Sequence, residues 1–117
     1  MEVTLIIKER WLSEIERECD PKKQEYRDLT PYYFARFLAC WDGCRNPDCK
    51  PKTCPQMKFK PVDSVQFAAG YQRSSRRATF VVKKIFIGEG FTKWGAAPGV
   101  EYFVLVLGNR IKESNEN

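Results

Sequence analysis

The chain contains no histidine, and this absence excludes several kinds of chemistry. A Ser-His-Asp triad, a Cys-His pair and a metal site with histidine ligands all require an imidazole side chain. General acid–base chemistry would therefore fall to lysine, glutamate, aspartate, tyrosine or cysteine. No apolar run reaches the length of a membrane span, and the first residues lack the basic-then-apolar layout of a signal peptide. We therefore expect a cytoplasmic protein with reduced thiols and no membrane partner.

The length and charge of the chain limit the number of domains and the kinds of partner to expect. A chain of 117 residues is long enough for one domain with a single modest core. We expect that domain over residues 1–113 and a disordered tail over residues 114–117. The formal net charge of +5 and the isoelectric point near 9.0 favour polyanionic partners. The composition does not indicate an oligomeric state.

The hydrophobic pattern predicts an α+β fold, with two helices early in the chain and most of the strands late. Five strands are expected, over residues 2–8, 24–27, 62–69, 78–87 and 101–107. Residues 9–19 have helical period, which places Cys19 on the buried face of a first helix. Thr30 and Pro31 are a typical start for a second helix, an N-cap hydroxyl followed by proline. The two lysines at 83–84 interrupt the fourth strand and predict a bulge or a barrel corner there.

A short segment after the first helix concentrates charged residues. If residues 24–27 are extended, Glu25 and Arg27 point to the same face of the strand, and Lys22 has to reach that face from the preceding turn. The spacing alone is that of a solvated edge strand with a salt bridge. The alternative is a lysine in a partly apolar cleft, where it can act as a base or nucleophile unless a nearby carboxylate stabilises its charge.

The same three residues match the G-x-K-x-x-E-x-R signature of the ASCH-domain family, with Asp20 standing where the family has glycine. Two later blocks, 65–71 (VQFAAGY) and 94–103 (WGAAPGVEYF), resemble small ASCH proteins of bacteria and phages. The resemblance covers nearly the whole chain, apart from a cysteine-rich part and the tail. It implies a PUA-like β-barrel of about five strands with two or three helices, into which residues 40–60 are inserted.

The resemblance also implies a function. Some ASCH proteins bind or cleave RNA, and this chain would then be an RNA- or nucleotide-binding domain. Others are amidohydrolases that act on acetylated cytidine, and in these the lysine of the signature is catalytic. The alternative implied for this chain is therefore a hydrolase of a modified nucleoside, with Lys22 and Glu25 as catalytic residues. Those hydrolases have a threonine at the position of Glu25.

A second set of residues, both basic and aromatic, predicts how a nucleotide would be held. Arginine pairs bidentately with phosphate, and aromatic rings stack on unpaired bases. Arg27, Arg73 and Arg76 are expected to hold phosphate or a base edge. Tyr71 and Trp94 are expected to stack on a base or to wall the site. The alternative is a solvated basic surface with a structural tryptophan.

Four of the five cysteines lie close together, as Cys40, Cys44, Cys49 and Cys54. Such a cluster in a reducing compartment is typical of a tetrahedral zinc site. Its role would be structural, because four protein ligands leave no open position for water. The alternative is a set of free or partly oxidised cysteines on a loop. A zinc loop of this kind also raises a third functional hypothesis, an adaptor that binds another protein.

Overall fold

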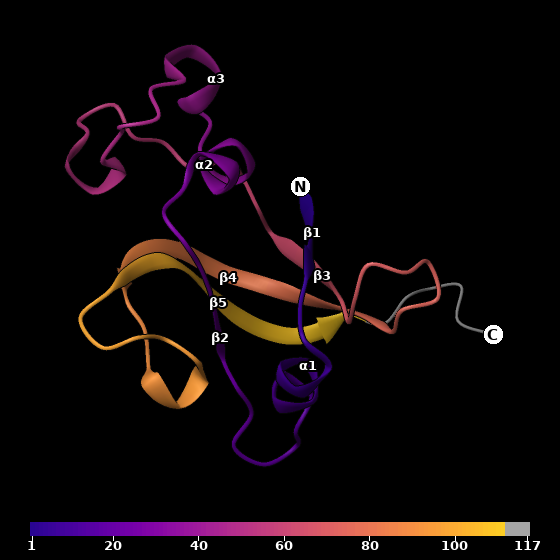
Figure 1. Ribbon diagram of the computed structural model, residues 1–117. Coiled ribbons are helices and arrows are strands. Elements are labelled where there is room, and N and C mark those ends of the chain that lie inside the picture. The colour runs from indigo at the N-terminus through magenta and orange to yellow at the C-terminus, as the bar shows by residue number, and fades with distance from the viewer. Residues whose placement is uncertain (112–117) are drawn as a thin grey trace.

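The structure, a computed structural model, describes residues 1–111 (Figure 1). The strands are β1 (Glu2–Ile6), β2 (Gln24–Arg27), β3 (Ser64–Ala68), β4 (Arg77–Glu89) and β5 (Glu101–Ile111). The helices are α1 (Glu9–Ile15), α2 (Pro31–Phe37) and α3 (Trp41–Cys44), with short 3-10 helices η1 (Pro51–Thr53) and η2 (Thr92–Trp94). The predicted α+β class is therefore confirmed. The tail predicted over residues 114–117 lies outside the described residues.

The five strands form one mixed sheet in the order β1-β3-β4-β5-β2. The long strands β4 and β5 pair antiparallel and curve together through the molecule (Figure 1). β3 pairs antiparallel with β4 and parallel with β1, and β2 pairs antiparallel with β5. The β4–β5 register shifts twice between Phe80 and Lys84, so the predicted bulge is confirmed.

β1 and β2 are the two edges of this sheet. Within residues 1–111 they form no strand pair with each other, so the predicted closed barrel is not seen. A side chain spans the gap instead, because Arg27 Nη2 donates a hydrogen bond to the carbonyl oxygen of Ile6 at 3.0 Å. The two edges therefore approach each other at one end, where the site described below lies.

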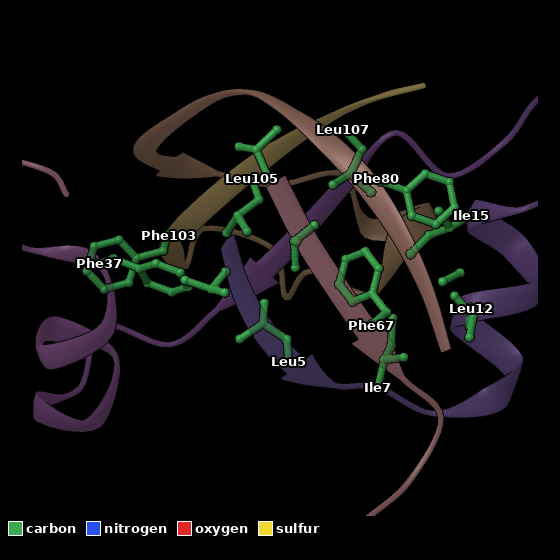
Figure 2. Packing of buried hydrophobic residues seen from close by; sticks show 14 of the residues in the cluster. Leu5, Ile7, Leu12, Ile15, Phe37, Phe67, Phe80, Phe103, Leu105 and Leu107 are labelled. Carbon is green, nitrogen blue, oxygen red and sulfur yellow. The ribbon is translucent and has the colours of Figure 1, made fainter. Parts of the chain in front are cut away.

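The core is formed where the helices cover the sheet (Figure 2). Phe37 from α2 lies against Phe103 from β5, with ring centroids 5.2 Å apart. Leu12 and Ile15 from α1 lie at the other end of the core, near Phe80 (Figure 2). The helical spacing of apolar residues in α1 and α2 thus buries one face of each helix, as predicted. Within residues 1–111, no helix is long and apolar enough to cross a membrane.

The prediction that Cys19 belongs to this core is wrong. α1 ends at Ile15, and Cys19 lies in the following turn with its side chain exposed. The turn is held by a hydrogen bond from the Lys22 amide to the carbonyl oxygen of Glu14, at 2.9 Å. This bond brings the chain back along α1, so that Lys22 rather than Cys19 is directed inward.

Candidate functional site

A cleft of about 390 Å³ opens where the ends of β1 and β2 meet α1 and the loop of residues 90–99. Four residues that the sequence singled out line this cleft: Lys22, Glu25, Arg27 and Trp94. Three of them come from residues 22–27 and the fourth from the loop of residues 90–99, so the cleft exists only in the folded domain. Aromatic side chains that the sequence did not indicate complete the wall: Trp11, Tyr26 and Tyr102.

The three charged residues form a connected set. Lys22 Nζ donates to Glu25 Oε1 at 2.6 Å, and Arg27 Nη2 donates to Glu25 Oε2 at 3.0 Å. Their side chains are 1%, 9% and 14% exposed for Lys22, Glu25 and Arg27 respectively. β2 is an edge strand with salt bridges, as the first interpretation expected, but the charged side chains are buried and not solvated. One carboxylate lies between two cations, which leaves one net positive charge in the wall of the cleft.

Local structure explains how these side chains meet. Glu25 and Arg27 pair opposite Leu105 and Phe103 of β5, and the two-residue repeat of β2 puts them on one face, as predicted. Lys22 reaches the same carboxylate from the turn before β2, also as predicted. Burial imposes a desolvation penalty on each of the three charged side chains, and the salt bridges among them offset that penalty.

The pKa of Arg27 follows from this arrangement. Burial acts to lower the pKa of the guanidinium, but the charge of Glu25 and the hydrogen bond with the Tyr33 hydroxyl raise it above its ordinary value. Arg27 is therefore cationic throughout the working range of pH. Its Nε atom is buried and has no hydrogen-bond partner among residues 1–111. An unsatisfied donor at such a position costs about 1–3 kcal/mol.

Aromatic rings surround the lysine. Lys22 Nζ lies 4.7 Å from the ring centroid of Trp11 and 6.0 Å from that of Tyr26, close enough for cation–π attraction. Tyr26 lies beside Tyr102, with ring centroids 5.7 Å apart. Its hydroxyl accepts a hydrogen bond from the Phe91 amide at 2.9 Å. Burial raises the pKa of Tyr26, so this hydroxyl is neutral near pH 7.

The loop of residues 90–99 fits against these rings because of its glycines. Gly95 has φ +102°, and a Cβ atom there would lie 3.2 Å from the Trp11 indole. A Cβ atom at Gly90 would lie 2.5 Å from the Tyr26 ring and 2.8 Å from Ala96 Cβ. The loop therefore needs both glycines to close over the cleft in this position.

We expect Gly90→Ala to lower the free energy of unfolding by about 1–3 kcal/mol, because the added methyl group would displace Tyr26 or the loop. Gly43→Ala is the matched control, since nothing lies within 4 Å of the added Cβ there. Urea denaturation monitored by circular dichroism measures both changes. If the two variants are equally stable, the loop is not packed on Tyr26 as described.

The remaining predicted site residues are not brought into this cleft. Tyr71 is 90% exposed and lines a neighbouring groove of about 360 Å³ with Arg27 and Arg36. Arg76 forms salt bridges with Glu9 and Glu16, and thereby ties the start of β4 to α1. Arg73 is exposed on the turn between β3 and β4.

The sequence missed Trp11, Tyr26 and Tyr102 in the cleft and Arg36 in the neighbouring groove. The available signal was weak: Trp11 lies beside the apolar stripe of α1 and not on it, and a tyrosine within a strand is ordinary. Arg36 lies one turn after Tyr32 on α2 and contacts its hydroxyl at 3.4 Å, a pairing that spacing alone allows but does not require.

The four clustered cysteines line a different hollow, of about 440 Å³, in the 40–60 insertion. Burial raises the pKa of the Cys49 thiol, and the neighbouring Cys54, Cys44 and Cys40 raise it further. The Cys49 thiol is therefore within electrostatic reach of the other three. Within residues 1–111, however, no three cysteine or acidic side chains converge with the geometry of a metal site.

The arrangement of the cleft suits a small anionic and planar ligand. It offers one net positive charge and several aromatic faces. No protein-family model, curated protein or solved structure matches the chain. The geometry of the cleft is therefore the main basis for assigning a function.

Proposed function

We propose that the chain is an RNA- or nucleotide-binding domain, and that the cleft holds one nucleotide. The observation that carries the proposal is the placement of the Lys22–Glu25–Arg27 set beside the rings of Trp11 and Trp94 in one cleft. Buried charges are costly, and a cleft that combines them with apolar walls is the usual character of a ligand site. A polyanionic ligand also agrees with the net charge of +5.

Each part of a nucleotide has a counterpart in this wall. Arg27 and Lys22 supply charge for phosphate or for an acceptor on a base edge. Trp94 and Trp11 supply faces on which a base can stack, an interaction worth about 1–3 kcal/mol per base. The ligand is expected to be single-stranded, because bases are accessible for stacking only outside a helix.

The neighbouring groove supports a ligand longer than one nucleotide. Arg27 and Ile6 line both hollows, so the two are adjacent. The groove adds Arg36 and the exposed ring of Tyr71. In this proposal the RNA strand continues past Arg27 and a second base stacks on Tyr71, while Arg73 belongs to the basic margin of the surface. Arg76 takes no part, because Glu9 and Glu16 pair with it.

We also propose that the fold is the PUA-like barrel of ASCH domains, in the cytoplasm. The support is that the three signature residues, which the family resemblance groups in sequence, line a single cleft in space. In this proposal the barrel would close at the gap between β1 and β2, which the Arg27 side chain spans.

One observation favours the second candidate, an amidohydrolase acting on a modified nucleoside such as acetylated cytidine. Lys22 is buried and lies 2.6 Å from Glu25, so a proton donor and a proton acceptor are in contact within the cleft. Water would attack the acyl carbon with its proton passing to the carboxylate, and the amine would leave with a proton from the ammonium. Release of acetate from the acetylated nucleoside would establish this activity, and binding without release would exclude it.

The binding proposal is tested by titrating a labelled single-stranded RNA oligonucleotide and following its fluorescence anisotropy. We expect the affinity to fall about tenfold between about 50 mM and about 200 mM salt, as for a site that contacts two or three phosphates. Tyr71→Ala is expected to weaken binding of the oligonucleotide but not of a nucleoside monophosphate. Undetectable binding at the lower salt concentration would contradict the proposal.

A further inference from the structure

The insertion between α2 and β3 is ordered but has almost no apolar core. Between residues 41 and 58 only Pro51 is buried, yet the chain forms α3, η1 and several tight turns, with Arg45 at φ 50°. Figure 1 shows this segment projecting beyond α2, away from the sheet. Trp41, Cys49 and Met57 are partly buried and packed against the domain core. Most of the segment is nevertheless exposed, and a loop of this length needs a further source of order.

Backbone hydrogen bonds join the two ends of the insertion. The amide of Ala39 donates to the carbonyl oxygen of Lys58, and the amide of Lys60 donates to that of Phe37, both at 2.8 Å. Leu38 and Phe59 form an isolated antiparallel bridge between these bonds. The segment between is thus a closed loop, within which all four cysteines lie.

The four cysteines are spread along this loop, each next to a turn or a short helix. Cys40 lies at its neck, Cys44 ends α3, Cys49 follows the next turn, and Cys54 follows η1. All four line the same hollow. We propose that these four thiols bind one Zn²⁺ ion, which supplies the cross-links that the missing core does not.

The surroundings suit a metal bound by thiolates. The amide of Lys58 donates to Cys40 Sγ at 3.4 Å, the kind of second contact that orients a metal ligand. Four basic and two acidic side chains between residues 41 and 58 give the loop a formal charge of +2, which offsets the charge of a zinc tetrathiolate. The loop is largely exposed, so the contraction that brings the sulfurs to bonding distance meets little packing resistance.

Binding would release the thiol protons to solvent as the four Zn–S bonds form, with no change of oxidation state. The ion would hold the insertion against the rest of the domain, because Trp41 packs on Phe34 and Lys52 contacts Glu101 at the start of β5. The nucleotide cleft shares no lining residue with this hollow. The inference is therefore independent of the proposed function.

Elemental analysis of the purified protein tests this inference. We expect about one zinc per chain in the wild type, none in the Cys44→Ser/Cys54→Ser variant, and an unchanged content in Cys19→Ser. A strong chelator should lower the melting temperature of the wild type but not of the double variant. Zn²⁺ added to chelator-treated wild type should restore that temperature.

Three results would overturn the inference: a metal-free wild type whose four thiols react freely even after Zn²⁺ is added, zinc retained by the double variant, or disulfides among the four cysteines under reducing purification. Co²⁺ titration separates loss of the site from loss of the fold, because tetrahedral thiolate coordination gives a visible absorption band that does not depend on thermal stability.

Discussion

Lys22→Ala is expected to reduce the affinity for single-stranded RNA by at least about tenfold, whereas Lys23→Ala should stay within about twofold of the wild type. The two lysines are adjacent in sequence, but the first is buried in the cleft and the second is exposed. Removing the Lys22 ammonium leaves Glu25 paired with Arg27 alone. The charged set then has no net positive charge to offer a phosphate.

Lys22→Arg separates the two candidate functions. Guanidinium keeps its charge, so a binding site should retain much of its affinity. A hydrolase that uses the Lys22 proton should lose turnover in the same variant, because guanidinium does not give up its proton at working pH. Anisotropy and acetate release measure the two outcomes. If both Lys22 variants bind RNA like the wild type, the cleft is not the binding site.

Glu25→Ala is expected to lower the free energy of unfolding by about 3–5 kcal/mol. The carboxylate contacts both Lys22 and Arg27, and its loss leaves a buried ammonium without a counter-charge. Glu18→Ala is the control, because Glu18 is exposed, and it should change the stability by less than about 0.5 kcal/mol. Urea denaturation measures both.

A double variant tests whether the unpaired Lys22 ammonium causes this loss of stability. In the Lys22→Met/Glu25→Ala double variant the unpaired ammonium is gone, so the loss of stability should be smaller than in Glu25→Ala alone. If instead the losses of unfolding free energy in Lys22→Met and Glu25→Ala simply add in the double variant, the two side chains are not coupled.

The strands could be predicted from the sequence because the core dictates their side-chain alternation. Val3, Leu5 and Ile7 are buried on one face, as their spacing indicates. The end of α1 could not be predicted in the same way. It depends on the bond between the Lys22 amide and the carbonyl of Glu14, and therefore on the burial of Lys22 in a cleft that later segments complete.

The candidate site was predicted best where one short segment, residues 22–27, presents it. Of the site residues predicted from later parts of the chain, only Trp94 lines the cleft. The two-residue repeat placed Glu25 and Arg27 on one face, and the structure joins them. Arg76 was grouped with the site because of nearby arginines, but the acidic residues of α1 hold it elsewhere. Trp11 enters the cleft only because α1 packs where β1 ends, and no local pattern carries that information.

The most direct test of nucleotide binding in the cleft uses the indole N–H signals of the protein's three tryptophans in a ¹H–¹⁵N NMR titration. Trp11 and Trp94 line the cleft, whereas Trp41 lies in the insertion and serves as an internal control. On addition of a nucleoside monophosphate, we expect the signals of Trp11 and Trp94 to shift and saturate together while that of Trp41 stays in place. Unshifted signals for Trp11 and Trp94, at nucleotide concentrations where the RNA oligonucleotide binds, would contradict the account.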